Sequence, residues 1–232
     1  MKQSANYSDV NAKLSVMVTA HPELLLTLSH FGIGLGVGDR SIGEVCRSHG
    51  VDPHFFLLIC NVYSFGNYIP TPSTIGSTDM SGLVPYLLRS HNYYLGKRLP
   101  HIGRHLQKIA RMLPARAAKV IMRFYDEYID EVTDHFRQEE TIVFPHIESL
   151  LAGRPDGYRI KDYLQNHGDL EDKLSDLTQI IFKYLPTEST DDDAIDMIFD
   201  ILEVGRDLHK HSLIEERILV PYVSNLEKSV EP

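Results

Sequence analysis

Two stretches of the chain place the same ionisable residues in apolar surroundings. "HFRQEETIVFPHIESL" begins at His135 and "HSLIEERILVPYVSNL" begins at His211, and each runs His, three residues, two glutamates and a later proline. Residues four apart share one face of a helix, so each histidine lies beside the first glutamate of its stretch, which is Glu139 or Glu215. A carboxylate in an apolar interior is costly unless it is protonated, paired or bound to a metal. The repeat therefore indicates a buried site that neutralises two glutamates.

Two further histidines, His91 and His167, lie on the apolar faces of their own predicted helices. With the repeated pairs they supply four imidazoles and two carboxylates. This mixture suits iron, manganese or zinc, and ligand softness alone does not choose among them. Such residues projecting from facing helices describe a dinuclear site in which each glutamate bridges two ions. The predicted ligands are His91, His135, Glu139, His167, His211 and Glu215.

Other ionisable residues near this set leave alternatives open. His101 and His105 flank the apolar face of the first long helix by one residue, and Glu171 follows His167 by one turn. We keep His105 as an additional candidate ligand and Glu171 as a ligand or as an acceptor that orients one. Glu140 and Glu216 fall one residue off the apolar face and are expected to be solvated. Ile142 is expected to lie inward.

Four long segments with apolar residues at helical spacing must position these ligands. They are predicted at residues 83–113, 115–151, 158–185 and 192–226, with short turn-rich breaks between them. Short connections imply antiparallel neighbours, so we predict an up-down-up-down four-helix bundle of the all-α class. At about 1.5 Å of rise per residue, the six proposed ligands fall within one layer about 10 Å thick.

A stretch crowded with Gly, Pro, Ser and Thr marks a predicted domain boundary. We predict a small helical N-terminal domain over residues 1–65, a linker over 66–82 and the metal-binding bundle over 83–228. Cys46 and Cys60 are spaced neither like a redox pair nor like a zinc knuckle, and we expect both to be buried thiols.

The composition is that of an ordinary globular protein. The 232 residues are 43% hydrophobic and 24% charged, with a formal net charge of -9. That charge argues against a nucleic-acid or anionic membrane partner, because binding to phosphates depends on Lys and Arg. No window approaches the length of apolar sequence that a membrane-spanning helix needs, and the first 25 residues have no apolar core behind a basic head, so we expect no secretory leader. We expect a cytoplasmic protein.

The stretch from about residue 80 to 226 resembles a hemerythrin-type (HHE) cation-binding domain, a family with HxxxE on two antiparallel helices and single histidines on the others. Within that family it is most similar to the di-iron proteins of iron-sulfur cluster repair, the RIC or ScdA-like group. "HFRQEETIVFP" and "HSLIEERILVP" resemble that group's repeated HxxxEExxLFP, and "HNYYLGKRLP" resembles its HHxYLRxxLP. "FGIGLGVGDRSIGEVCRSHGVD" resembles its N-terminal module.

Two departures from that group matter. Asn92 follows His91 where many relatives carry a second histidine, so the first-helix ligand could shift by one position or be replaced by His105. Gly36 and Val37 stand where the N-terminal module usually carries a Cys-Cys pair. Any repair chemistry that needs those two thiols is therefore missing.

The resemblance implies a centre of two iron ions with an oxo or hydroxo bridge, with manganese or zinc as alternatives. Three functions remain open. The first is repair or protection of iron-sulfur clusters under oxidative or nitrosative stress, the second is binding or sensing of oxygen or nitric oxide, and the third is a di-iron oxidoreductase acting on nitric oxide or peroxide. The partners expected are one of these small molecules, damaged iron-sulfur proteins and a second copy in a homodimer. No separate acid or base residue is evident, so the pattern does not decide whether the protein is an enzyme.

Overall fold

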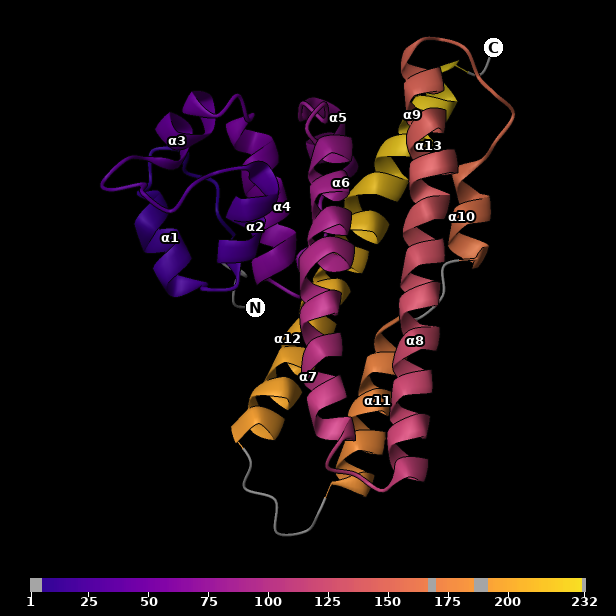
Figure 1. The fold of residues 1–232 in the computed structure, drawn as a ribbon. Coiled ribbons are helices and arrows are strands. Elements are labelled where there is room, and N and C mark those ends of the chain that lie inside the picture. Colours follow the sequence, from indigo (N-terminus) through magenta and orange to yellow (C-terminus); the bar gives the residue numbers. More distant parts are fainter. Residues whose placement is uncertain (1–5, 167–169, 186–191, 231–232) are drawn as a thin grey trace. The chain divides into compact units, whose positions relative to one another are not determined.

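The structure is a computed structural model that describes residues 6–166, 170–185 and 192–230. Every named element in these ranges is helical (Figure 1), and the strand-like pairing found there is a single bridge between Lys13 and Ser41. The predicted all-α class is confirmed. None of the described helices is both long enough and apolar enough to pass through a membrane.

The chain divides into two compact units. Unit 1 comprises Met1–Ser90, Ile147–Ile160 and Lys210–Pro232, and unit 2 comprises His91–His146 and Lys161–His209. The domain boundary expected at residues 66–82 stays a prediction.

The N-terminal part of unit 1 consists of short helices with clear sequence signals. Ser41 accepts a hydrogen bond from the Glu44 backbone N–H while Glu44 accepts one from the Ser41 N–H, a capping box that starts α3. Asp52 caps α4 just before Pro53 by accepting a hydrogen bond from the Phe55 backbone N–H. Helix α4 packs against α2 and α3 and buries most of its length. These helices are α1 (Leu14–Ala20), α2 (Leu24–Phe31), α3 (Ile42–Ser48), α4 (Pro53–Ser64) and α5 (Pro72–Ser77).

The second unit is built on long helices. Helix α8 packs against both α7 and α11. Gly103 of α7 allows this close approach, because a Cβ there would lie 3.0 Å from Cε1 of Tyr125, whose hydroxyl donates to the Leu99 carbonyl. Their apolar residues, spaced three and four apart, bury one shared core that includes residues of α12. The bounds are α7 (Leu99–Ala110), α8 (Ala115–Gln138), α11 (Leu170–Tyr184) and α12 (Asp192–Ile214).

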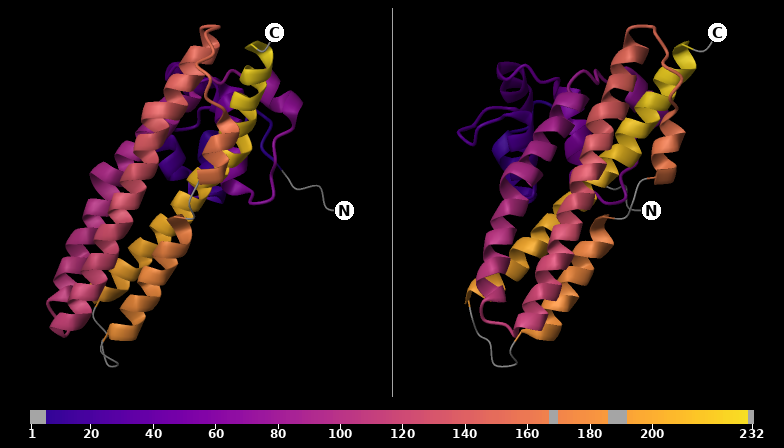
Figure 2. Two further views of the ribbon diagram at one scale, coloured as in Figure 1. Left: turned by 90° about the vertical axis from the view of Figure 1, so that its right-hand side faces the viewer. Right: turned by 45° about the vertical axis from the view of Figure 1, so that its right-hand side comes forward.

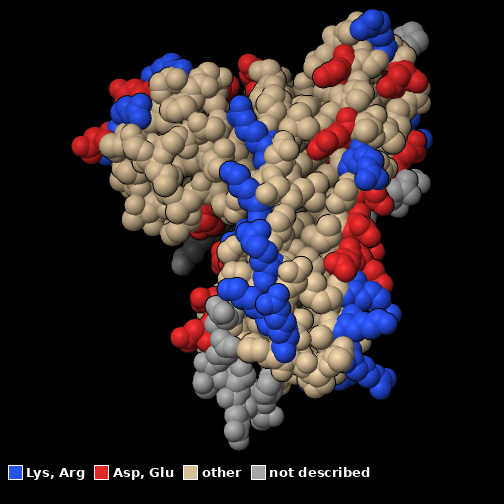
Figure 3. All heavy atoms as spheres, in the orientation of Figure 1, with Lys and Arg blue, Asp and Glu red and all other residues tan. Residues whose placement is uncertain are grey.

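The remaining helices extend these elements along the chain. The second predicted segment, residues 115–151, coincides with α8 and its continuation to the end of α9 (Figure 2). The first and fourth predicted segments likewise begin where α6 and α12 begin. Figure 3 shows a line of Lys and Arg side chains along α7, although the protein as a whole is acidic. The helices concerned are α6 (Leu83–Tyr93), α9 (Phe144–Leu151), α10 (Ile160–Asn166) and α13 (Val220–Val230).

Three π-helical segments interrupt the long helices of the described chain, namely η1 (Tyr94–Arg98), η2 (Glu139–Val143) and η3 (Glu215–Leu219). In each, the N–H of the residue after the segment bonds to the carbonyl of its first residue, five positions back. A proline follows that first residue by six positions in all three cases. Proline lacks an N–H and its ring presses on the carbonyl four residues back, so the preceding turn widens. The proline in each repeat therefore explains a π turn that begins on the glutamate.

A π turn also shifts the buried face of the helix that follows it. Ile142, which was expected to lie inward, is 41% exposed, whereas Val143 is 0% exposed. The expectation for Ile142 is wrong: it assumed regular α-helical spacing through a turn that holds one extra residue, although the equivalent Ile218 of the second repeat is buried.

Candidate metal centre

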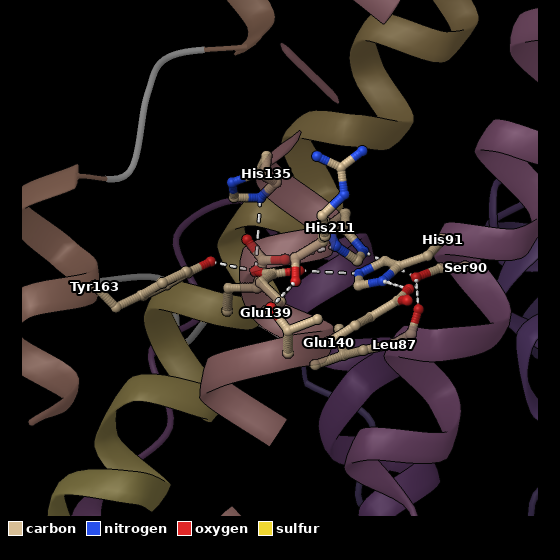
Figure 4. Close-up of polar contacts among 11 residues, drawn as sticks. Leu87, Ser90, His91, His135, Glu139, Glu140, Tyr163 and His211 are labelled. Carbon is tan, nitrogen blue, oxygen red and sulfur yellow. Dashed lines mark hydrogen bonds and ion pairs between the residues drawn. The ribbon is translucent and has the colours of Figure 1, made fainter. Parts of the chain in front are cut away.

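The first histidine-glutamate group lies in unit 2 around the carboxylate of Glu139, which is fully buried. His91 Nε2 of α6 lies 3.0 Å from Glu139 Oε2. His135 Nε2, one helical turn before Glu139, lies 3.5 Å from Oε1, and the Tyr163 hydroxyl of α10 donates to that same oxygen (Figure 4). Two imidazoles and one phenol thus surround this carboxylate.

The other ring nitrogen of His91, Nδ1, also has a carboxylate partner. His91 Nδ1 lies 2.9 Å from Oε1 of Glu140. An ionised carboxylate only accepts hydrogen bonds, so Nδ1 carries a proton in this contact and Nε2 is the ring nitrogen that faces Glu139. Glu140 was expected to be solvated, and its side chain is indeed 41% exposed, but it is also the partner of His91. That role was missed because the contact joins two separate helices and leaves no signature in local spacing.

The second histidine-glutamate group lies in unit 1, where His211 and Glu215 are both buried. His211 Nε2 is 2.5 Å from Glu215 Oε1. His211 Nδ1 is 3.0 Å from the Ser90 hydroxyl oxygen, and that hydroxyl donates to the Leu87 carbonyl at 2.7 Å (Figure 4). A serine hydroxyl has one proton. Because it goes to Leu87, Ser90 can only accept from His211, so His211 Nδ1 also carries a proton and Nε2 faces its glutamate.

In both groups, therefore, an imidazole Nε2 and a carboxylate oxygen face each other at short range. The distance from Nε2 to the carboxylate oxygen is 3.0 Å in the first group and 2.5 Å in the second. A nitrogen and an oxygen this close repel each other unless a proton or a metal ion lies between them. Histidines that bind metals characteristically donate their other N–H to a carboxylate or another acceptor, as His91 and His211 do. The residues present thus fit a metal.

The other candidates from the sequence are distributed as follows. His91 is buried and Asn92 is exposed, so the histidine itself faces Glu139. His105 follows His91 by 14 residues, about 21 Å along a helix, and forms a different group with His101 and Asp200. His167 lies outside the described residues, as does the side chain of Glu171.

Several residues near the centre were not anticipated from the sequence. Tyr163 and Ser90 reach the two groups only through tertiary packing, so local spacing could not identify them. Asp207 is buried and accepts a hydrogen bond from the Tyr94 hydroxyl at 2.7 Å. It lies four residues before His211 on α12, and that spacing could have drawn attention to it.

Comparison with known proteins agrees with this geometry. Residues 86–223 match the hemerythrin HHE cation binding domain, and this match covers more than half of the 232 residues. It includes His91 and both repeated His-Glu pairs. Comparison with curated proteins finds no match. The chain belongs to the hemerythrin family of HHE cation-binding domains.

Proposed function

We propose that this protein is a non-haem di-iron protein. The observation that carries the proposal is the pair of buried His-Glu groups whose imidazoles already have their Nδ1 protons engaged by Glu140 and Ser90. An up-down-up-down four-helix bundle over residues 83–228, preceded by an N-terminal domain over 1–65, would present the ligands. Those ligands are His91, His135, Glu139, His167, His211 and Glu215.

The iron would supply binding of a small ligand and one-electron chemistry. The protein's own residues prepare the site for it. Glu140 and Ser90 hold the two imidazoles with Nε2 directed at the glutamates, and Tyr163 donates a hydrogen bond to Glu139. Full burial of Glu139 and Glu215 excludes bulk water from the carboxylates and strengthens their attraction to a cation.

For the biological role we propose repair or protection of iron-sulfur clusters in the cytoplasm under oxidative or nitrosative stress. This rests on the repeated "HFRQEETIVFP" and "HSLIEERILVP" and on the similarity of residues 31–52 to the N-terminal module of the repair group. Damaged iron-sulfur proteins would be the partners.

One observation favours a second function, the binding or sensing of oxygen or nitric oxide. The chain has two cysteines, Cys46 and Cys60, and both are buried free thiols. Burial raises the pKa of Cys46 to about 12 and raises that of Cys60 well above its ordinary value. A thiol reacts as its thiolate, so neither cysteine is activated for exchange with a damaged cluster.

A single set of assays separates these functions. Iron-loaded protein would be mixed with an iron-sulfur enzyme inactivated by nitric oxide, and its absorption spectrum would be recorded under oxygen, nitric oxide and peroxide. Recovery of the enzyme by wild type but not by Glu215→Ala supports repair, with Glu216→Ala as the matched control. A spectral change on gas binding without recovery supports sensing, and repeated consumption of nitric oxide or peroxide supports an oxidoreductase.

A further inference from the structure

A second group of metal-type ligands lies within unit 2, on α7 and α12. His101 and His105 are four residues apart on α7, and their rings are 4.4 Å apart between centroids. His101 Nε2 lies 3.1 Å from Oδ2 of Asp200. One ligand atom from each of these three residues lies within 4.8 Å of the other two.

The fold explains why the three side chains meet where they do. Each of them immediately precedes a residue of the shared core, namely Ile102, Leu106 or Ile201, all nearly fully buried. The three side chains therefore lie at the rim of the packed face, partly buried and still open to solvent. A position of this kind lets an ion enter while the backbones on both sides stay fixed by the core.

Two observations indicate that the group is arranged for an additional ligand. His105 Nδ1 is buried and has no hydrogen-bond partner among the described residues, which is uncommon for a buried polar atom. Arg98 binds the other oxygen of Asp200 at 3.0 Å, which orients the carboxylate and leaves Oδ2 directed at His101. An ion pair between His101 and Asp200 alone would account for their contact but not for the buried nitrogen of His105.

We propose that His101, His105 and Asp200 form a separate binding site for a divalent transition-metal ion of the zinc class. Two imidazoles and one carboxylate are a three-ligand set that zinc accepts with a fourth position open to water or an exogenous ligand. Zinc bonds of about 2.0–2.2 Å place neighbouring ligand atoms roughly 3.4 Å apart, close to the 3.1 Å between His101 Nε2 and Asp200 Oδ2. His101, whose side chain is 40% exposed, has the freedom to adjust to the ion.

The site is distinct from the His-Glu centre, and zinc itself is the probe that tests it. The full chain, with its His-Glu centre loaded with iron, would be titrated with zinc by calorimetry. The variants are His101→Ala and Asp200→Asn, with His54→Ala as the control, because His54 is an exposed histidine on α4. We expect one zinc ion per chain, bound at least about 10-fold more weakly in either site variant and unchanged in the control.

Glu139→Ala separates this inference from the proposed function, since it removes a ligand of the His-Glu centre but none of this site. Zinc bound with the same stoichiometry and affinity by wild type and His101→Ala would overturn the inference, as would zinc that is lost only in Glu139→Ala. Circular dichroism would verify that His101→Ala is folded. If Asp200→Asn fails to fold because Arg98 loses its partner, His105→Asn serves as the second variant with the same expected loss.

Discussion

Removing the hydroxyl of Ser90 should weaken metal binding without touching any proposed ligand. In Ser90→Ala the Nδ1 proton of the buried His211 loses its acceptor, which lies 3.0 Å away. A buried donor without a partner costs about 1–3 kcal/mol. In the metal-free protein the imidazole can move its proton to Nε2 and donate it to Glu215, so most of this cost falls on the metal-bound form.

At about 1.4 kcal/mol per tenfold change, that cost corresponds to roughly 5- to 150-fold in affinity. Loss of an outer partner of a metal-binding histidine typically costs about 10- to 100-fold, in agreement with this range. The assay is retention of iron against increasing concentrations of a chelator.

Ser229→Ala is the matched control. Ser229 Oγ donates to the carbonyl three residues before it at 2.7 Å, as Ser90 Oγ does, but it is exposed and contacts none of the histidines that the structure describes. Iron retention by Ser90→Ala equal to that of wild type would refute the reasoning. Equal weakening by Ser229→Ala would show that the loss comes from the serine-to-backbone bond rather than from His211.

Further predictions concern Glu140, Pro145, Cys46 and His30. Glu140→Ala should lower iron affinity about 10- to 100-fold, because His91 loses its Nδ1 acceptor. Glu216→Ala, at the equivalent position of the second repeat, should leave iron affinity unchanged. Chelator competition measures both. Pro145→Ala should let η2 return to α-helical bonding and displace the residues that follow, so its iron affinity should fall; retained affinity together with an unchanged π turn in a crystal structure would contradict this. Cys46 should resist thiol reagents at pH 8 in the folded protein and react on unfolding, because burial raises its pKa to about 12. Burial lowers the pKa of His30 from 6.5 to about 3, so its contribution to stability is complete above pH 6.5 and is lost as the pH falls toward 3. His30→Phe should reduce this pH dependence of the unfolding free energy by up to about 1.4 kcal/mol per pH unit. Denaturant unfolding of the metal-free protein measures it.

The repeated pairs could be predicted from the sequence because both members of each pair lie on one helix. His135 with Glu139 and His211 with Glu215 follow directly from four-residue spacing. Glu140 and Ser90, which decide where the imidazole protons lie, contact histidines on other helices. Such contacts depend on how the helices pack, and spacing within one segment does not contain that information.

The error at Ile142 has a different cause, and the sequence contains a sign of the irregular turn in which this residue lies. A proline six residues after Glu139 forces the intervening turn to widen, and the same spacing recurs after Glu215 and Tyr94. The prediction counted regular helical turns through that proline and therefore placed Ile142, rather than Val143, in the buried position. Asp200 was not predicted from the sequence either. Its partner His101 lies on another helix, and spacing within one segment does not contain such contacts.

The number of iron ions bound per chain tests the central claim most directly. Protein purified from iron-replete cells would be measured by elemental analysis for wild type, Glu139→Ala, Glu215→Ala and the control Glu216→Ala. We predict about two iron ions per chain in wild type and in the control, and loss of one or both in each of the other variants, because each removes a carboxylate ligand from the site. Wild type without iron, or the same iron content in all four proteins, would contradict the account.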